Sequence, residues 1–146
     1  MKSKVYFTSE ITPEKVVELY RALGVELPGK VAVKVHSGEK GNQNFLRPEF
    51  WRPMVEEVHG TIVECNTAYG DASTGVRANT ESHLKLIEEH GWNKYFDVDL
   101  MDAEGPDVVW PIPNGKVIQE NHLGKHILNY DSMLVLAHFK GHPMGG

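Results

Sequence analysis

The sequence predicts an α/β domain built on a mainly parallel sheet with helices on both faces. Segments that alternate apolar residues at every second position are interleaved with segments whose apolar residues recur every three or four positions. Strands that alternate with helices form βαβ units with right-handed crossovers, and such units make parallel sheets. With 146 residues, no internal repeat and no visible boundary, the chain is expected to form a single domain over residues 1–146.

Strands are predicted from this periodicity and from the turn residues between segments. The segment at 30–36 is typical, because its three valines share one face of a strand. The sequence Pro-Asn-Gly at 113–115 is a turn signal between two short apolar segments, and it predicts a small hairpin excursion near 107–119. The other strands are expected at residues 5–8, 61–66, 96–101 and 133–140.

The first two helices are predicted by the residues at their ends. Thr12 is expected to cap the first helix, Pro13 to occupy its first position and Gly24 to end it. Pro48 is expected to open the second helix, which carries an apolar stripe. Residues 124–130 fit one or two further helical turns.

The third helix is expected to begin with Thr80 as its cap and to end at Gly91. Leu84 and Ile87 are expected to face the core, with Leu86 beside them. The order of these helices and strands along the chain supports the α/β prediction.

Composition argues against several classes of protein. The formal net charge is -5 and no basic run occurs, which argues against nucleic acid as a partner. No stretch approaches the roughly 20 apolar residues of a membrane span, and the first residues lack the features of a signal peptide. A cytoplasmic protein with no membrane partner is therefore expected. The single cysteine, Cys65, rules out an internal disulfide and a four-cysteine metal site, and its strand position favours inert packing.

The last predicted strand carries ionisable side chains toward the sheet edge where α/β folds bind ligands. Five consecutive apolar residues at 133–137 precede His138, Lys140 and His142. His138 and Lys140 are two positions apart, so on a strand they share one face. Histidine transfers protons near neutral pH, and these three residues are the candidate catalytic group. The alternative is an ordinary strand followed by surface histidines.

Polar, glycine-containing loops also follow the predicted strands at 30–36 and 61–66. Because parallel strands bring their carboxyl ends to one edge, we expect these loops and the final segment to converge on one pocket. Arg77 and Lys140 would make that pocket electropositive, which favours a small-molecule or anionic ligand. Solvated surface loops are the alternative. The candidate ligand-binding residues are Lys34, His36, Glu39, Asn66, Tyr69 and Arg77.

Histidine spacing suggests a divalent metal as a further expectation. His122 and His126 are four positions apart, as are His138 and His142. On a helix this spacing places both imidazoles on one face, a usual geometry for a shared metal. The second pair follows a strand, so the helical argument does not strictly apply, but His138 and His142 are the candidate metal ligands. Structural or surface histidines are the commoner alternative, and no HExxH, P-loop or GxGxxG motif occurs.

Several longer motifs occur in a fixed order along the chain. They are Val-Lys-Val-His-Ser-Gly-Glu-Lys-Gly-Asn at 33–42, Asn-Phe-Leu-Arg-Pro at 44–48, Asn-Thr-Ala-Tyr at 66–69, Gly-Val-Arg-Ala-Asn-Thr at 75–80, His-Leu at 83–84 and His-Phe-Lys-Gly-His at 138–142. Through these motifs the sequence, from about residue 31 onward, resembles the domain of unknown function 362 family in its iron–sulfur-associated branch. It departs from the family at 100–105, where an Ala-Asp-Gly-like motif is expected.

The resemblance implies that this chain is the N-terminal fragment of a longer protein. Relatives continue past this point, and many carry cysteine clusters that bind [4Fe-4S], so any cluster is expected in the missing C-terminal part. The expected function is that of an iron–sulfur-associated protein whose α/β domain serves a redox or small-molecule enzyme with a His/Lys/Arg-lined pocket. The alternative is a non-catalytic binding or scaffold module for the missing iron–sulfur domain. The sequence leaves open whether the chain is an enzyme.

Overall fold

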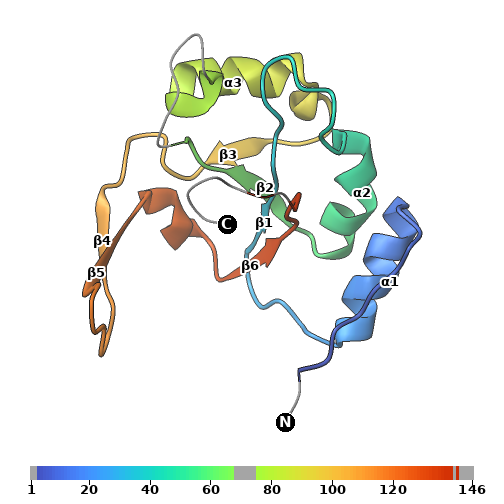
Figure 1. Cartoon of the computed structure of the whole chain (residues 1–146), viewed down its shortest axis with the longest axis horizontal. Coiled ribbons are helices and arrows are strands. Elements are labelled where there is room, and N and C mark those ends of the chain that lie inside the picture. The colour runs from blue at the N-terminus through green and yellow to red at the C-terminus, as the bar shows by residue number, and fades with distance from the viewer. Residues whose placement is uncertain (1–2, 68–74, 140, 142–146) are drawn as a thin grey trace.

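A four-stranded parallel sheet forms the centre of the computed structural model, which describes residues 3–67, 75–139 and 141. The strands lie in the order β3-β2-β1-β6, and every neighbouring pair is parallel (Figure 1). The prediction of an α/β fold with a mainly parallel sheet is therefore confirmed. The strands are β1 (Val31–Lys34), β2 (Thr61–Glu64), β3 (Val98–Leu100) and β6 (Ser132–Val135).

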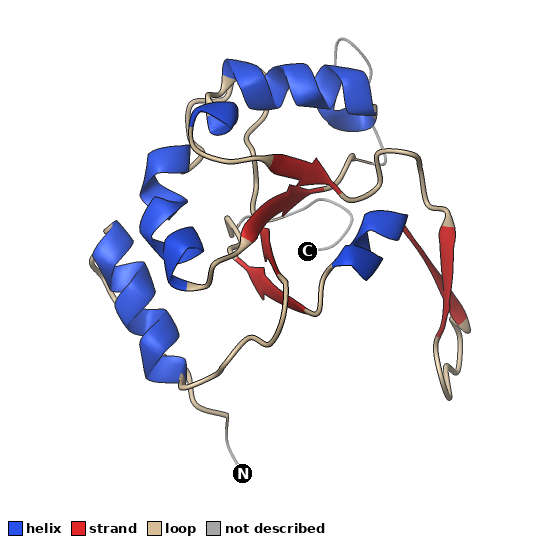
Figure 2. Ribbon diagram, turned by 180° about the vertical axis from the view of Figure 1, so that it is seen from behind, coloured by secondary structure: helices blue, strands red, loops and turns tan. Residues whose placement is uncertain are grey.

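Three α-helices pack against one face of the sheet, as Figure 2 shows from behind. The valines of β1 on this face contact a core that includes Val17 of α1, Met54 of α2 and Ile87 of α3. Right-handed crossovers explain the arrangement, because β1-α2-β2 and β2-α3-β3 both move in one direction across the sheet and so place their helices on one side. The helices are α1 (Pro13–Leu23), α2 (Pro48–Glu57) and α3 (Thr80–Glu89).

The opposite face of the sheet is covered more thinly. Ala32 and Val63 point to this side and pack with Met101 against Ile127 and Tyr130. Ile127 belongs to the 3-10 helix η3 (Lys125–Asn129), which supplies the helical turns predicted for 124–130. Helical segments thus lie on both faces, with α-helices on one side and a short 3-10 helix on the other.

The order of the strands reverses beside β1. The chain adds β2 and β3 on one side of β1 and then returns to its other side with β6. In open α/β sheets, the gap between the carboxyl ends at such a reversal is where ligands bind. This topology predicts a ligand site at the carboxyl ends of β1 and β6.

The predicted hairpin is present, displaced toward the C-terminus. β4 (Val108–Pro111) and β5 (Glu120–Leu123) pair antiparallel and lie apart from the main sheet in Figure 1. The turn between them is longer than the Pro-Asn-Gly signal implied, since the amide of Ile112 donates to the carbonyl of Gln119 at 2.8 Å and closes the loop there.

Three local predictions were wrong. Residues 5–8 form no strand, because no described strand pairs with them. The cap of α3 is Asn79, whose side chain accepts from the Ser82 amide, while the hydroxyl of Thr80 donates to the carbonyl of Ala103. Leu84 is exposed on α3, and Leu86 is buried with Ile87.

The caps of α1 are as predicted. The Thr12 side chain accepts from the Lys15 amide, and Gly24 ends the helix with a φ of 62°. No helix in the described ranges is long and apolar enough to cross a membrane.

Candidate functional site

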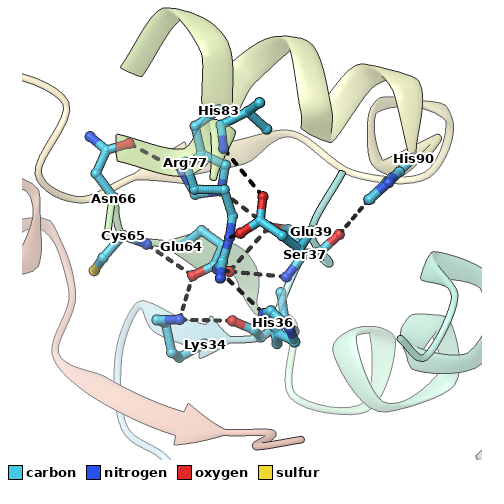
Figure 3. A network of polar contacts seen from close by, with 12 residues as sticks. Lys34, His36, Ser37, Glu39, Glu64, Cys65, Asn66, Arg77, His83 and His90 are labelled. Atoms are coloured by element: carbon cyan, nitrogen blue, oxygen red, sulfur yellow. Dashed lines mark hydrogen bonds and ion pairs between the residues drawn. The ribbon is translucent and has the colours of Figure 1, made fainter. Parts of the chain in front are cut away.

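Glu64, at the carboxyl end of β2, is the centre of a cluster of polar side chains (Figure 3). Only 2 % of this residue is exposed. Its Oε2 lies 2.5 Å from Lys34 Nζ and accepts from the Cys65 amide, and its Oε1 accepts from the Ser37 amide at 2.9 Å. Parallel pairing of β1 and β2 places Lys34 opposite Val63 and therefore beside Glu64.

The surroundings of Glu64 favour its ionised form. Burial alone would raise the pKa of this carboxyl group, but the charge and hydrogen bond of Lys34 and the two backbone N–H groups outweigh it. The pKa of Glu64 is therefore lowered from its ordinary value. A carboxylate that keeps its charge inside the protein must be held by partners of this kind.

Arg77 does not supply the free positive charge that the sequence analysis expected. Its Nε lies 2.9 Å from Glu39 Oε2, and its Nη1 lies 3.6 Å from Glu64 Oε1. The pKa of Glu39 is lowered, because the hydrogen bonds and charge of Arg77 and two backbone amides outweigh the effect of burial. Two cations, Lys34 and Arg77, thus face two carboxylates, so the described part of the cluster is balanced in charge.

His36 and His138 lie at the strand-order reversal, just beyond β1 and β6. Their ring centroids are 6.0 Å apart, and His36 Nδ1 is 3.4 Å from Arg77 Nη1. Parallel pairing of β1 with β6 explains the contact, since both residues follow neighbouring strands. Of the predicted ligand-binding and catalytic residues, the structure therefore brings Lys34, His36, Glu39, Arg77 and His138 to one edge.

Asn66 lies at the same edge but points inward. Its side-chain Oδ1 contacts His83 Nδ1 at 3.1 Å, and its side-chain Nδ2 donates to Thr80 Oγ1. Tyr69, Lys140 and His142 lie outside the described residues. Their roles remain predictions.

The sequence analysis missed two members of the cluster, Ser37 and His83. Both are buried, and Ser37 Oγ lies 3.1 Å from His83 Nε2. Each belongs to a motif that carries the family resemblance, which was the available signal. A serine in a polar loop and a histidine on a helix are otherwise common in surface positions.

The metal prediction is corrected in part. His122 lies in β5 and His126 in η3, so this pair does not share a helical face. Among the residues that the structure describes, no group of three or more His, Cys, Asp and Glu side chains could hold a metal ion. The pair of His138 and His142 stays a prediction, because His142 is not described.

The donors present do not fit a [4Fe-4S] cluster. The sequence contains one cysteine, whereas such clusters are held by a set of thiolates. Cys65 is half-buried, and burial together with Asp102 raises the pKa of its thiol to about 11. A thiol in this environment is a poor metal ligand and nucleophile.

Several hollows on the described surface lie away from this cluster. One of about 530 Å³ is lined by residues such as Trp110, Leu128 and Met133. Another of about 400 Å³ lies between the N-terminal segment and α1 and includes Leu136. At the carboxyl edge the described residues form a cluster of side chains. The pocket predicted there also includes residues outside the described ranges and stays a prediction.

The structure is that of an α/β protein in which the strand order of a parallel sheet reverses beside a cluster of charged side chains. A family model described as "Domain of unknown function (DUF362)" matches residues 31–146. The chain belongs to this family, and the matched range contains the whole cluster. No curated protein and no solved structure shows a significant match to the chain.

Proposed function

We propose that this chain is the ligand-binding α/β domain of an enzyme that acts on a small anionic molecule. The observation that carries the proposal is the contact between His36 and His138, whose rings lie 6.0 Å apart where the strand order reverses. Ligands of open α/β sheets bind at this position, and histidine both binds anions and transfers protons near neutral pH.

Lys34 is the cation of the cluster best placed to meet a ligand. Its ammonium group has three hydrogens, of which two go to the Val35 carbonyl and to Glu64. For the third we find no partner among the described residues, and 28 % of the side chain is exposed. Lys34 would therefore donate a hydrogen bond to the anion, while Glu64 holds its charge in place from behind.

The undescribed candidates complete the proposal. Lys140 and His142 follow His138 within four residues, so they would approach the same ligand. Lys140 would add the positive charge that Arg77 gives to Glu39. His138 and His142 would hold a divalent metal or move protons.

The test is binding of sulfate, a stable dianion, by the wild-type chain and by His138→Ala. His138 is exposed, so its loss should leave the melting temperature nearly unchanged. Removing a hydrogen bond to a charged group costs about 1.5–3 kcal/mol, so affinity should fall about tenfold or more. Isothermal titration calorimetry measures the affinity, and Lys140→Ala should behave in the same way.

His122→Ala is the matched control, because His122 is also an exposed histidine but lies on the hairpin against Glu120. It should bind sulfate as the wild type does. Equal affinity in all three variants would show that the ligand does not lie at the carboxyl edge. Arg77→Ala is a poor probe, since this side chain is 13 % exposed and its loss would strand Glu39.

The iron–sulfur association is a separate part of the proposal. The resemblance to the iron–sulfur-associated branch supports it, and the single cysteine of these 146 residues cannot supply the usual set of thiolates. The chain purified without oxygen should be colourless and low in iron. Stoichiometric iron and acid-labile sulfide would contradict this.

A non-catalytic binding or scaffold module is the second candidate. Exposed apolar side chains on the hairpin favour it, since Val109 and Trp110 of β4 are each about half exposed. Such side chains commonly mark protein interfaces. Turnover of a small anionic molecule that is lost in His138→Ala would favour the first candidate, and anion binding without turnover would favour the second.

A further inference from the structure

Ser37 and His83, which the proposed function does not use, form a chain of hydrogen bonds with Glu64 behind Lys34. Ser37 Oγ lies 3.1 Å from Glu64 Oε1 on one side and 3.1 Å from His83 Nε2 on the other (Figure 3). Glu64 is 2 % exposed, Ser37 1 % and His83 0 %. The far ring nitrogen of His83 faces Asn66 Oδ1 at 3.1 Å.

The partners of Asn66 set the direction of this chain. The side-chain Nδ2 of Asn66 donates to Thr80 Oγ1, and the Thr80 hydroxyl donates to the carbonyl of Ala103. Asn66 therefore presents its carbonyl oxygen to His83, and His83 Nδ1 must carry a hydrogen to satisfy it. In the neutral imidazole, Nε2 is then an acceptor.

Ser37 consequently has one hydroxyl hydrogen and two acceptors for it. While His83 is neutral, its Nε2 and Glu64 Oε1 compete for this hydrogen, so Glu64 shares the Ser37 hydroxyl with the imidazole. When His83 gains a proton at Nε2, the ring donates to Ser37 Oγ instead. The hydroxyl hydrogen is then released to Glu64.

We propose that anion binding at the carboxyl edge is coupled to the uptake of one proton at His83 Nε2, which frees the Ser37 hydroxyl to donate its hydrogen to Glu64 alone. The coupling rests on the proposed function. An anion that accepts the third hydrogen of Lys34 shares the charge of this ammonium group with Glu64, so a full hydrogen bond from Ser37 stabilises the Glu64 carboxylate. The proton comes from solvent, one N–H bond forms, and the hydroxyl hydrogen changes only its acceptor.

The charges around His83 fit a group that is neutral until an anion arrives. Burial lowers the pKa of His83, and Arg77 of the 3-10 helix η1 (Val76–Ala78) lowers it further. Glu64 of β2, Asp102 beyond β3 and Glu39 beyond β1 act in the opposite direction. A bound anion adds to the negative side of this balance.

The experiment titrates the wild-type chain with sulfate near neutral pH and follows the imidazole nitrogens by NMR. Sulfate does not itself take up a proton in this range, so any uptake belongs to the protein. Nε2 of His83 should move from the unprotonated to the protonated position as sulfate binds. Reading each imidazole separately distinguishes His83 from His36 and His138, and calorimetry in two buffers of different ionisation enthalpy counts the protons.

Ser37→Ala removes the link between His83 and Glu64. This variant should bind sulfate more weakly, and its His83 signal should stay at the unprotonated position. Ser132→Ala is the matched control, because the Ser132 hydroxyl donates to the carbonyl of Pro28 at the other end of the sheet. It should match the wild type in affinity and in proton uptake.

Sulfate binding without a change at His83 would overturn the coupling and leave the proposed function standing. A hydrogen on Nε2 of His83 in the free protein would do the same. The absence of saturable sulfate binding would overturn both proposals.

Discussion

At the residue scale, Lys34 keeps the buried carboxylate of Glu64 in its ionised form. The two side chains are 28 % and 2 % exposed, so Glu64 depends on Lys34 far more than Lys34 depends on Glu64. A buried pair contributes little net stability compared with apolar residues, but removing one partner strands the other. A buried pair that adds little stability is expected where its charge serves ligand binding.

Lys34→Met should lower the free energy of unfolding by about 3 kcal/mol, because it leaves a buried carboxylate without its cation. Urea denaturation measures this change. Lys85→Met is the matched control, since Lys85 pairs with Glu81 on the exposed face of α3 and should change stability little. A Lys34 variant as stable as the Lys85 variant would show that the ionised Glu64 does not depend on Lys34.

His126 gives a second prediction, on the dependence of stability on pH. Its Nδ1 lies 2.6 Å from Asp99 and its Nε2 lies 3.2 Å from Glu104, so both ring nitrogens face carboxylates. The hydrogen bond to Asp99 raises the pKa of His126 above its ordinary 6.5. A raised pKa means that the stabilisation is fully present below 6.5 and is lost as pH rises through the higher folded value.

The wild type should therefore lose stability between pH 6.5 and the folded pKa of His126 more steeply than His126→Gln, which cannot be protonated. Urea denaturation at a series of pH values checks this. Parallel curves for the two proteins would mean that His126 is not held as an imidazolium.

At the scale of elements, the loop after β1 is shaped by glycine. Gly38 has a φ of 100°, and a Cβ atom there would lie 2.7 Å from His90 Nδ1 and 2.8 Å from Phe45 Cδ1. Phe45 and His90 are stacked on one another with ring centroids 4.4 Å apart. The loop can therefore deliver Ser37 to Glu64 only with no side chain at position 38.

Gly38→Ala should cost about 3 kcal/mol or more, from backbone strain and from overlap with the stacked rings. Gly41→Ala separates the two effects, since Gly41 has a φ of 77° but open space around it. It should cost only the backbone strain, about 1–2 kcal/mol. Equal losses in thermal denaturation would show that the rings move aside for the new methyl group.

At the scale of the whole molecule, side chains are buried to different extents in the central sheet and in the hairpin. β1 is central, and its side chains are buried on both faces by the two clusters around the sheet. The hairpin of β4 and β5 has largely exposed side chains, and a two-stranded hairpin by itself is marginal in water.

Native-state hydrogen exchange should follow this gradient. Amides of β1 and β2 should exchange slowest, with free energies near that of global unfolding, and those of β4 and β5 fastest. Protection of the hairpin equal to that of β1 would contradict its exposure, and would indicate a partner on its apolar side chains.

The sequence by itself determined the features that depend on neighbouring residues. Thr12 and Gly24 bound α1 as predicted, because caps act within one turn of a helix. The alternation of strands and helices predicted the parallel sheet, and with it the edge at which His36 and His138 meet.

Only the tertiary structure decided which distant groups became partners. Residues 5–8 have strand composition, yet a strand also needs a neighbour to bond. Arg77 is neutralised by Glu39, and His83 is bound by Ser37 and Asn66. Periodicity cannot predict such contacts, because their energies depend on distance and burial in space, and the loops that bring these groups together carry no repeating pattern.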